Sequence, residues 1–220
     1  MAHTQDKESP DPSRYAASAK STGGGGFNHE DEVAAYYLAQ MLAGSISFGT
    51  PCGIITEIKF QTRVDGWLLD DLLLTFAGTD GARRCAFSIK SNAQFAADHA
   101  APTDFVHDCW EQFLKGAPMD PARDLLALAV SGTPSDVLDD FHTLRGLAEA
   151  SELGSFEGRL GVKGFADDGK RRMAASFGCP SDLAARFPGE LSANAASIIA
   201  RVMVIDFDFP SASSRPLVRE

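Results

Sequence analysis

Two apolar runs separated by a glycine-containing turn form the clearest pattern of hydrophobic and polar positions in the chain. The first run, Gly66–Phe76, is rich in leucine, and the second is Arg84–Ser91. Between them, Gly78 and the Asp80-Gly81 pair provide residue types that readily adopt the positive φ angles of hairpin turns. The pattern therefore predicts two strands joined as a β-hairpin.

Ionisable residues interrupt both apolar runs of this hairpin. Side chains alternate between the two faces of a strand, so Ser88 and Lys90 share one face of the second run. The acidic pair Asp70-Asp71 lies in the first run, and it can converge on the same spot. Burying a charge is costly unless the charge is paired or coordinates a metal. This spot is therefore a candidate for chemistry, and solvation at a sheet edge is the alternative interpretation.

Hydrophobic periodicity predicts further elements on both sides of the hairpin. In chain order they are a helix over 29–43, a strand over Ile54–Arg63, the hairpin, a helix over Phe105–Leu114, a buried strand over Asp124–Ser131, and a helix from Ser135 or Asp136 to about Ala150. This order predicts an α/β fold in which helices flank a mixed β-sheet.

Composition divides the chain into four segments. They are a disordered N-terminal tail (1–26), a core domain (27–150), a C-terminal extension packed on the core (151–210), and a polar tail or linker (211–220). The extension is predicted to contain a helix over Leu191–Ala200 and a strand over Arg201–Phe209. Between Glu152 and Pro188, scattered glycines weaken the pattern, and it predicts no element there.

Bulk composition indicates the class of protein and the cellular compartment in which we expect it. An apolar content of 44% and a charged content of 23% are ordinary for a soluble globular chain. The four cysteines show no C-x-x-C spacing, which favours a reducing compartment over a disulfide framework or a zinc site. There is no secretory signal, and no stretch approaches the roughly twenty apolar residues that span a bilayer. We therefore expect a cytoplasmic protein that does not enter a membrane.

A net charge of −10 argues against a free-standing nucleic-acid binder, because contacts to phosphates need a basic surface. Any such role must come from a local patch, a bridging metal or other subunits. The candidate phosphate contacts are Arg83, Arg84, Lys170, Arg171 and Arg172. For each of these taken singly, a solvated surface position is the alternative.

Several common catalytic motifs are missing. The tetraglycine is not followed by Gly-Lys-Ser/Thr, so there is no P-loop, and the chain has neither G-x-S-x-G nor H-E-x-x-H. A Ser88/Lys90 dyad for nucleophilic hydrolysis is conceivable, because a desolvated lysine can act as a base. No glycine sequence suited to an oxyanion hole adjoins it.

One interpretation uses the whole pattern. Carboxylates bind a hard cation such as Mg²⁺ or Mn²⁺, the cation polarises a phosphoryl group, and a lysine can orient the attacking water. The ordered set of Glu30, Asp70-Asp71, Ser88-Ile-Lys90 and the helix that follows resembles the PD-(D/E)xK restriction-endonuclease-like superfamily. The resemblance covers about residues 27–132 and implies a restriction-endonuclease-like mixed sheet flanked by helices.

This resemblance assigns roles to individual residues. It implies that Asp71 and Glu30 bind the metal, that Lys90 acts on the attacking water, and that Asp70 and Ser88 are secondary candidates for the catalytic site. Position 88 is serine where the family usually has Glu, Asp or Gln, so the site lacks one negative charge. The alternative function is therefore a catalytically inactive nuclease-like domain that mediates interaction or oligomerisation.

A narrower resemblance rests on three runs, GGGGFNHEDEVAAYYLAQMLAG, SIKSNAQF and DFVHDCWEQF. Together they are similar to the N-terminal nuclease effector domains, Mrr-like or dsDNA-endonuclease-like, of bacterial anti-phage STAND and NACHT NTPases. This implies double-stranded DNA as the substrate. It also implies a homo-oligomer, or attachment to an NTPase or sensor domain, with the chain either a part of a longer protein or a stand-alone relative.

Overall fold

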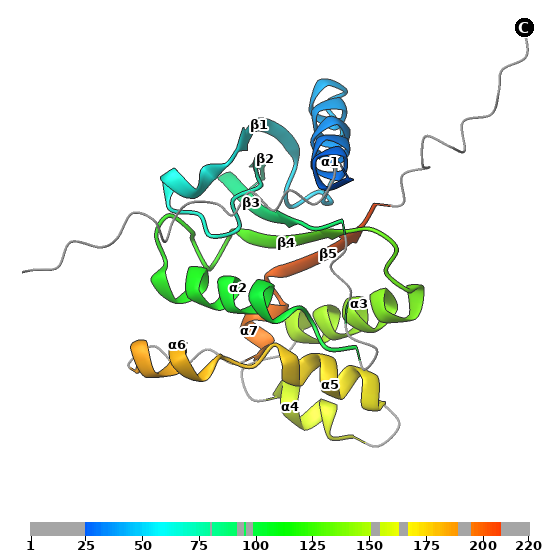
Figure 1. Cartoon of the computed structure of the whole chain (residues 1–220), viewed down its shortest axis with the longest axis vertical. Coiled ribbons are helices and arrows are strands. Elements are labelled where there is room, and N and C mark those ends of the chain that lie inside the picture. Colours follow the sequence, from blue (N-terminus) through cyan, green and yellow to red (C-terminus); the bar gives the residue numbers. More distant parts are fainter. Residues whose placement is uncertain are drawn as a thin grey trace, which may run out of the picture.

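A five-stranded mixed β-sheet with helices on both faces forms the centre of the computed structural model (Figure 1). The structure describes residues 25–79, 81–91, 95, 99–150, 155–162, 167–188 and 195–207. The strands are β1 (Ile54–Phe60), β2 (Leu72–Gly78), β3 (Gly81–Ile89), β4 (Leu125–Val130) and β5 (Val202–Asp206), and they neighbour one another in that order. The predicted α/β fold, with a mixed sheet between helices, is confirmed.

Strand direction changes at β3. β1, β2 and β3 form an antiparallel meander, whereas β3, β4 and β5 run parallel. In the β2–β3 hairpin, Leu72 pairs with Phe87 and Gly78 pairs with Gly81. Parallel neighbours need a crossover connection. The helix α2 (Thr103–Lys115) lies between β3 and β4, and a longer helical segment lies between β4 and β5.

The helices are distributed unequally over the two faces of the sheet. α1 (Gly25–Leu42) covers one face, and α2 and the later helices cover the other (Figure 1). The later helices are α3 (Ser135–Ala150), α4 (Ser155–Leu160), α5 (Asp168–Ser176), α6 (Ser181–Arg186) and α7 (Ala195–Ile199). All six residues of β4 are buried, because both of its faces are covered.

Strand alternation divides the core into two layers. On the α1 side, Leu72 and Phe87 pack with Val33 and Tyr37 of α1. On the other side, Ala86 belongs to the core that contains Trp110 of α2 and Phe141 of α3. The Trp110 indole N–H donates to the carbonyl oxygen of Phe177 at 2.9 Å, so α2 is tied to the C-terminal end of α5 within this core.

The predicted boundaries of the first two strands were wrong. The predicted strand Ile54–Arg63 ends at Phe60, because Gln61 adopts a left-handed conformation (φ 51°) and a 3₁₀ helix, Thr62–Asp65, follows. The predicted strand Gly66–Phe76 begins only at Leu72, since Gly66 also has a positive φ of 91°. The second hairpin strand begins at Gly81 instead of Arg84.

The segment between Glu152 and Pro188 contains helices that the sequence pattern did not predict. α4, α5 and α6 are six, nine and six residues long, and each buries only one or two side chains, such as Phe156, Met173 and Leu183. Helices this short show too few repeats for a periodicity to stand out.

Other predictions fall at the edge of the described residues. The predicted N-terminal tail lies outside them up to residue 24, while Gly25 already belongs to α1. The predicted polar tail or linker, 211–220, lies outside them entirely. The described parts of the predicted C-terminal helix and strand are α7 and β5. In the described part of the chain, no helix combines the length and apolar character needed to cross a bilayer.

The four cysteines give a direct test of this packing. All are free thiols; Cys52, Cys85 and Cys109 are buried, and Cys179 is half-buried. Burial raises the pKa of Cys85 and of Cys109 well above the usual value, so neither forms the reactive thiolate readily. In native protein at pH 8, we expect an aromatic disulfide reagent to modify Cys179 first and the other three slowly. In guanidinium chloride all four should react, and rapid native labelling of Cys85 or Cys109 would contradict the fold.

Candidate active site

Asp71 lies at the start of the β2–β3 ladder. Its backbone N–H donates to Phe87 O at 3.2 Å, and its carboxylate Oδ2 accepts from the Ile89 N–H at 2.6 Å. One step beyond the Leu72–Phe87 pair, the antiparallel register places Asp71 opposite Ser88. The side chain thus bonds the end of the neighbouring strand, which holds its carboxylate beside the last residues of β3.

Lys90 follows β3 directly, and its backbone is fixed by β4. The Lys90 N–H donates to Ala129 O at 2.9 Å, while its side chain is exposed. Among the described residues, Lys90 forms no ion pair with Asp70 or Asp71 within 4.0 Å, and Asp70 instead pairs with Arg63 at 3.7 Å. The acids that precede β2 therefore do not neutralise the Lys90 charge through a direct ion pair.

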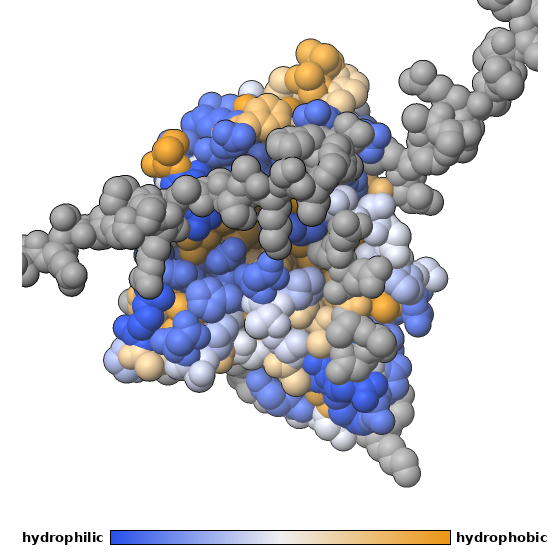
Figure 2. Space-filling view, in the orientation of Figure 1, coloured by the Kyte–Doolittle hydropathy of each residue, from blue (hydrophilic) through white to orange (hydrophobic). Residues whose placement is uncertain are grey.

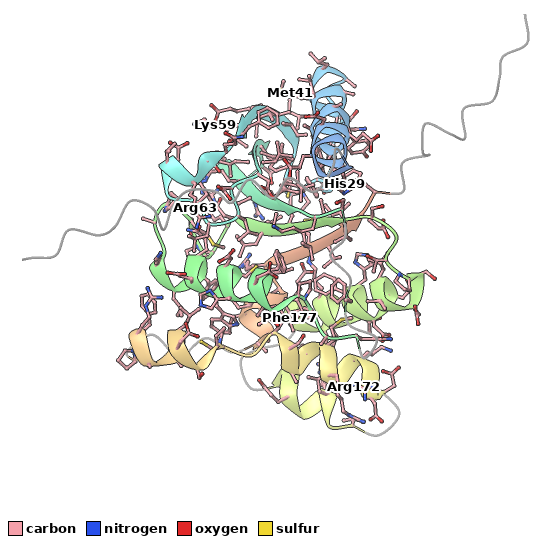
Figure 3. The ribbon with its side chains drawn as sticks, in the orientation of Figure 1. His29, Met41, Lys59, Arg63, Arg172 and Phe177 are labelled. Carbon is pink, nitrogen blue, oxygen red and sulfur yellow. The ribbon has the colours of Figure 1, made fainter. Side chains whose placement is uncertain are left out.

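Glu30 is carried to the same region by α1. His29, Val33 and Tyr37 are buried and lie at helical spacing, so they fix the face that α1 turns toward the sheet. Glu30, next to His29, is exposed at the flank of that face. Figure 3 shows His29 where the first turns of α1 lie beside the sheet. The helix packs against β1 and against β3, the strand that Lys90 directly follows.

The charges of these three residues act on one another. Burial raises the pKa of Glu30, the Asp71 charge raises it further, and Lys90 lowers it. Burial also raises the pKa of Asp71, against the opposing effects of the Ile89 N–H and Lys90. Glu30, Asp71 and Lys90 come from three separate elements, and the fold brings them within electrostatic range of one another.

The donor set at this site consists of hard oxygen groups. Glu30 and Asp71 offer carboxylates, and Ser88 is a half-buried hydroxyl on the strand opposite Asp71. Mg²⁺ commonly uses one or two carboxylates and keeps several waters, so these residues fit such an ion. The Ser88/Lys90 dyad is less well supported, because the exposed Lys90 lacks the desolvation that would make it a base.

Three potential metal-binding side chains meet at a different place, on α2. Within the described residues, donor atoms of His107, Asp108 and Glu111 lie within 4.8 Å of one another. This group is engaged in ion pairs that join α2 to α6: His107 Nε2 lies 3.0 Å from Asp182 Oδ2, and Glu111 Oε1 lies 3.2 Å from Arg186 Nη2. Its spacing along one helix is visible in the sequence, and the structure gives it a role in packing.

Arg84 is tied into the fold, although the sequence suggested a phosphate contact. Its Nη2 lies 2.6 Å from Asp124 Oδ2 and donates to Pro118 O, also at 2.6 Å. The guanidinium stacks 5.1 Å from the ring centroid of Trp67. Asp124 is only 2% exposed, so Arg84 neutralises a buried carboxylate.

The basic cluster on α5 is distant from the candidate site. Lys170 Nζ lies 2.6 Å from Asp140 Oδ1 and 2.9 Å from Asp167 Oδ2, and Arg171 pairs with Asp168 at 3.2 Å. α5 lies beyond α3, on the face of the sheet opposite α1, where Arg172 also lies (Figure 3). Arg83, near the start of β3, lines a pocket that two other arginines, from other parts of the chain, also line. The five predicted phosphate contacts therefore do not form one surface with Lys90.

Comparison with known proteins found no matching family model, curated protein or solved structure.

Replacing Arg84 separates a structural role from a role in phosphate binding. Because Arg84→Gln leaves the buried Asp124 carboxylate without its cation, we expect the free energy of unfolding to fall by roughly 3 kcal/mol. Arg172→Gln, an exposed arginine on α5, should change it by less than about 0.5 kcal/mol. Urea unfolding followed by tryptophan fluorescence measures both. Equal stability of the two variants would contradict the structural role of Arg84.

Proposed function

We propose that this chain is a metal-dependent DNA endonuclease domain that hydrolyses phosphodiester bonds. The observation that carries the proposal is the convergence of Glu30, Asp71 and Lys90, in which Lys90 forms no ion pair within 4.0 Å with the acids that precede β2. In this site Glu30 and Asp71 hold Mg²⁺ or Mn²⁺, and Lys90 faces the reacting phosphate. The double-stranded form of DNA is the proposed substrate.

The order of elements supports this proposal. α1, β1, β2, β3, α2 and β4 follow one another as in the core to which the PD-(D/E)xK motif belongs. Asp71 stands at the start of the second strand, and Lys90 directly follows the third. We therefore propose the restriction-endonuclease-like fold as the finer description of this α/β sheet. Function still has to be argued from the site, because one fold serves many activities.

Two carboxylates whose pKa values are both raised are suited to a divalent cation. The Asp71 charge raises the pKa of Glu30, which means that the two anions repel. A divalent cation held by both carboxylates would offset that repulsion, and the serine at position 88 leaves the site with one carboxylate fewer for this task. When bound, the ion would polarise the phosphoryl group and lower the pKa of a water molecule.

The residues of the chain position the other parts of the reaction. The Ile89 N–H fixes the Asp71 carboxylate, so this ligand needs little reorganisation before it binds. Lys90, anchored through its backbone to Ala129, presents a positive charge that orients the attacking water or stabilises charge on the phosphate. Ser88 adds a hydroxyl, and Asp70 is drawn aside by Arg63.

DNA binding by this acidic chain needs help from outside the site. The net charge is −10, and Arg84, Lys170 and Arg171 are occupied by carboxylates. We propose that affinity comes from the metal, from Lys90, and from association as a homo-oligomer or with an NTPase or sensor domain. An effector domain of a bacterial anti-phage system would work in this way.

A catalytically silent interaction domain is the second candidate function. Two observations favour it: the serine at position 88, and exposed apolar side chains on α1 and on the 3₁₀ helix after β1, where Leu42 is 78% and Val64 is 94% exposed. Figure 2 shows apolar residues gathered at the top of the view, over α1 and β1. Such a surface suits self-association.

A plasmid-cleavage assay with Mg²⁺ or Mn²⁺ separates the two functions. Lys90→Ala should lower the cleavage rate of supercoiled plasmid about 100-fold, because it removes a charge that acts in the transition state. Lys115→Ala, an exposed lysine on α2, is the matched control and should retain the wild-type rate. Equal cleavage by wild type and Lys90→Ala would remove this mechanism, and no cleavage by wild type would favour the interaction domain.

Position 88 offers a test of the metal site that does not depend on activity. Ser88→Glu places a third carboxylate opposite Asp71, so we expect Mn²⁺ affinity measured by calorimetry to rise about tenfold. Without metal, the added repulsion should lower the melting temperature. Ser181→Glu adds the same charge on α6 and should leave Mn²⁺ affinity unchanged. A Ser88→Glu protein with wild-type affinity would show that Glu30 and Asp71 do not bind the ion there.

A further inference from the structure

A pocket of about 480 Å³ lies at the end of the parallel strands opposite to Lys90. Three arginines from separate parts of the chain line it: Arg83 near the start of β3, Arg145 on α3, and Arg201 just before β5. The strands β3, β4 and β5 run parallel, so their first residues lie at one edge of the sheet and Lys90 lies at the other. This pocket is therefore separate from the candidate nuclease site.

Positive charge exceeds negative charge in this pocket. Among the described residues that line it, Glu149 is the acid, and its Oε1 lies 2.8 Å from Arg145 Nη2. The Nε of Arg145 is buried, and no hydrogen-bond acceptor in the described part of the chain reaches it. Burial lowers the pKa of Arg201, the charges of Arg83 and Arg145 lower it further, and the charges of Glu149 and Asp120 oppose this effect. Three guanidinium groups from separate parts of the chain therefore line one partly desolvated space, where an anion would find several charged donors.

An aromatic pocket of about 600 Å³ adjoins the arginine pocket. The two share Ser47, Phe48 and Met203 in their linings. Tyr37 is buried and stacks on Phe48, with ring centroids 5.7 Å apart, whereas Tyr36 lines the same hollow and is 42% exposed. Phe207 is also part of this lining. The carboxylate of Asp206, also in this lining, already accepts from the Thr133 N–H at 2.6 Å. The aromatic pocket therefore offers flat apolar surfaces beside a cluster of guanidinium groups.

We propose that the two pockets together bind a mononucleotide, with its phosphate among Arg83, Arg145 and Arg201 and its base against the aromatic side chains. Guanidinium groups bind phosphate oxygens through paired, charge-assisted hydrogen bonds. Nucleobases stack on aromatic rings with little dependence on base identity. The proposal does not rest on the nuclease function, since it uses none of the residues of that site.

Calorimetric titration with adenosine 5′-monophosphate, adenosine and inorganic pyrophosphate tests both halves of the proposal. We expect the monophosphate to bind at least tenfold more tightly than either of the other two. Arg145→Gln should weaken its binding about tenfold or more, because a charge-assisted hydrogen bond is lost. Arg159→Gln removes an exposed arginine on α4 and is the matched control, with unchanged affinity expected.

The opposite substitution keeps the test decisive if Arg145→Gln folds poorly. Glu149→Gln removes the competing carboxylate, so binding of the monophosphate should become several-fold tighter. Lys90→Ala should bind it as wild type does. No binding of the monophosphate at millimolar concentration, equal affinity of Glu149→Gln and wild type, or binding of duplex DNA alone would overturn the proposal. Pyrophosphate binding as tight as the monophosphate would overturn its aromatic half.

Discussion

β3 is the constraint on which the rest of the structure depends. It is the strand at which the antiparallel meander meets the parallel half of the sheet: β2 pairs with residues 81–87 of β3, and β4 pairs with residues 85–89. Cys85, Ala86 and Phe87 are fully buried, because helices cover both faces. β3 has a strand on each edge and helices over both faces. A shift of its register would cost much free energy, since a slip of one residue would turn its apolar side chains to the wrong faces. Its two ends are therefore fixed points.

Both candidate sites lie at those fixed points. At one end, Lys90 leaves the sheet beside the Asp71 carboxylate, which the Ile89 N–H holds. At the other end, Arg83 enters the sheet within the arginine pocket. Charges tolerate these positions because the strand ends are less buried than its middle. The same strand thus supplies a rigid support for both proposed sites, the one for a cation at its end and the one for an anion near its start.

The long segment after β4 completes the molecule. α3 to α7 return the chain to the sheet, so that β5 pairs in parallel with β4 and Arg201 reaches the pocket that Arg83 and Arg145 also line. Ion pairs on these helices, such as Lys170 with Asp140, occupy basic residues that would otherwise suit phosphate. In the described part of this segment, Arg145, Lys170, Arg171 and Arg186 each form an ion pair with a carboxylate.

The sequence alone determined the sheet, because long apolar runs with alternation leave few other structures open. β2, β3, β4 and the helices α1, α2 and α3 were all predicted in the correct order. It also singled out Asp71 and Lys90, since charges within apolar runs stand out, whereas Glu30 was selected through the resemblance to the PD-(D/E)xK superfamily. Tertiary structure alone decided which carboxylates bind the basic residues: Asp124 binds Arg84 and Asp140 binds Lys170, although each pair is far apart in the sequence. It also decided the arginine pocket. Residues 83, 145 and 201 are far apart in the sequence and come together only when β5 pairs with β4, so no local sequence pattern predicts their proximity.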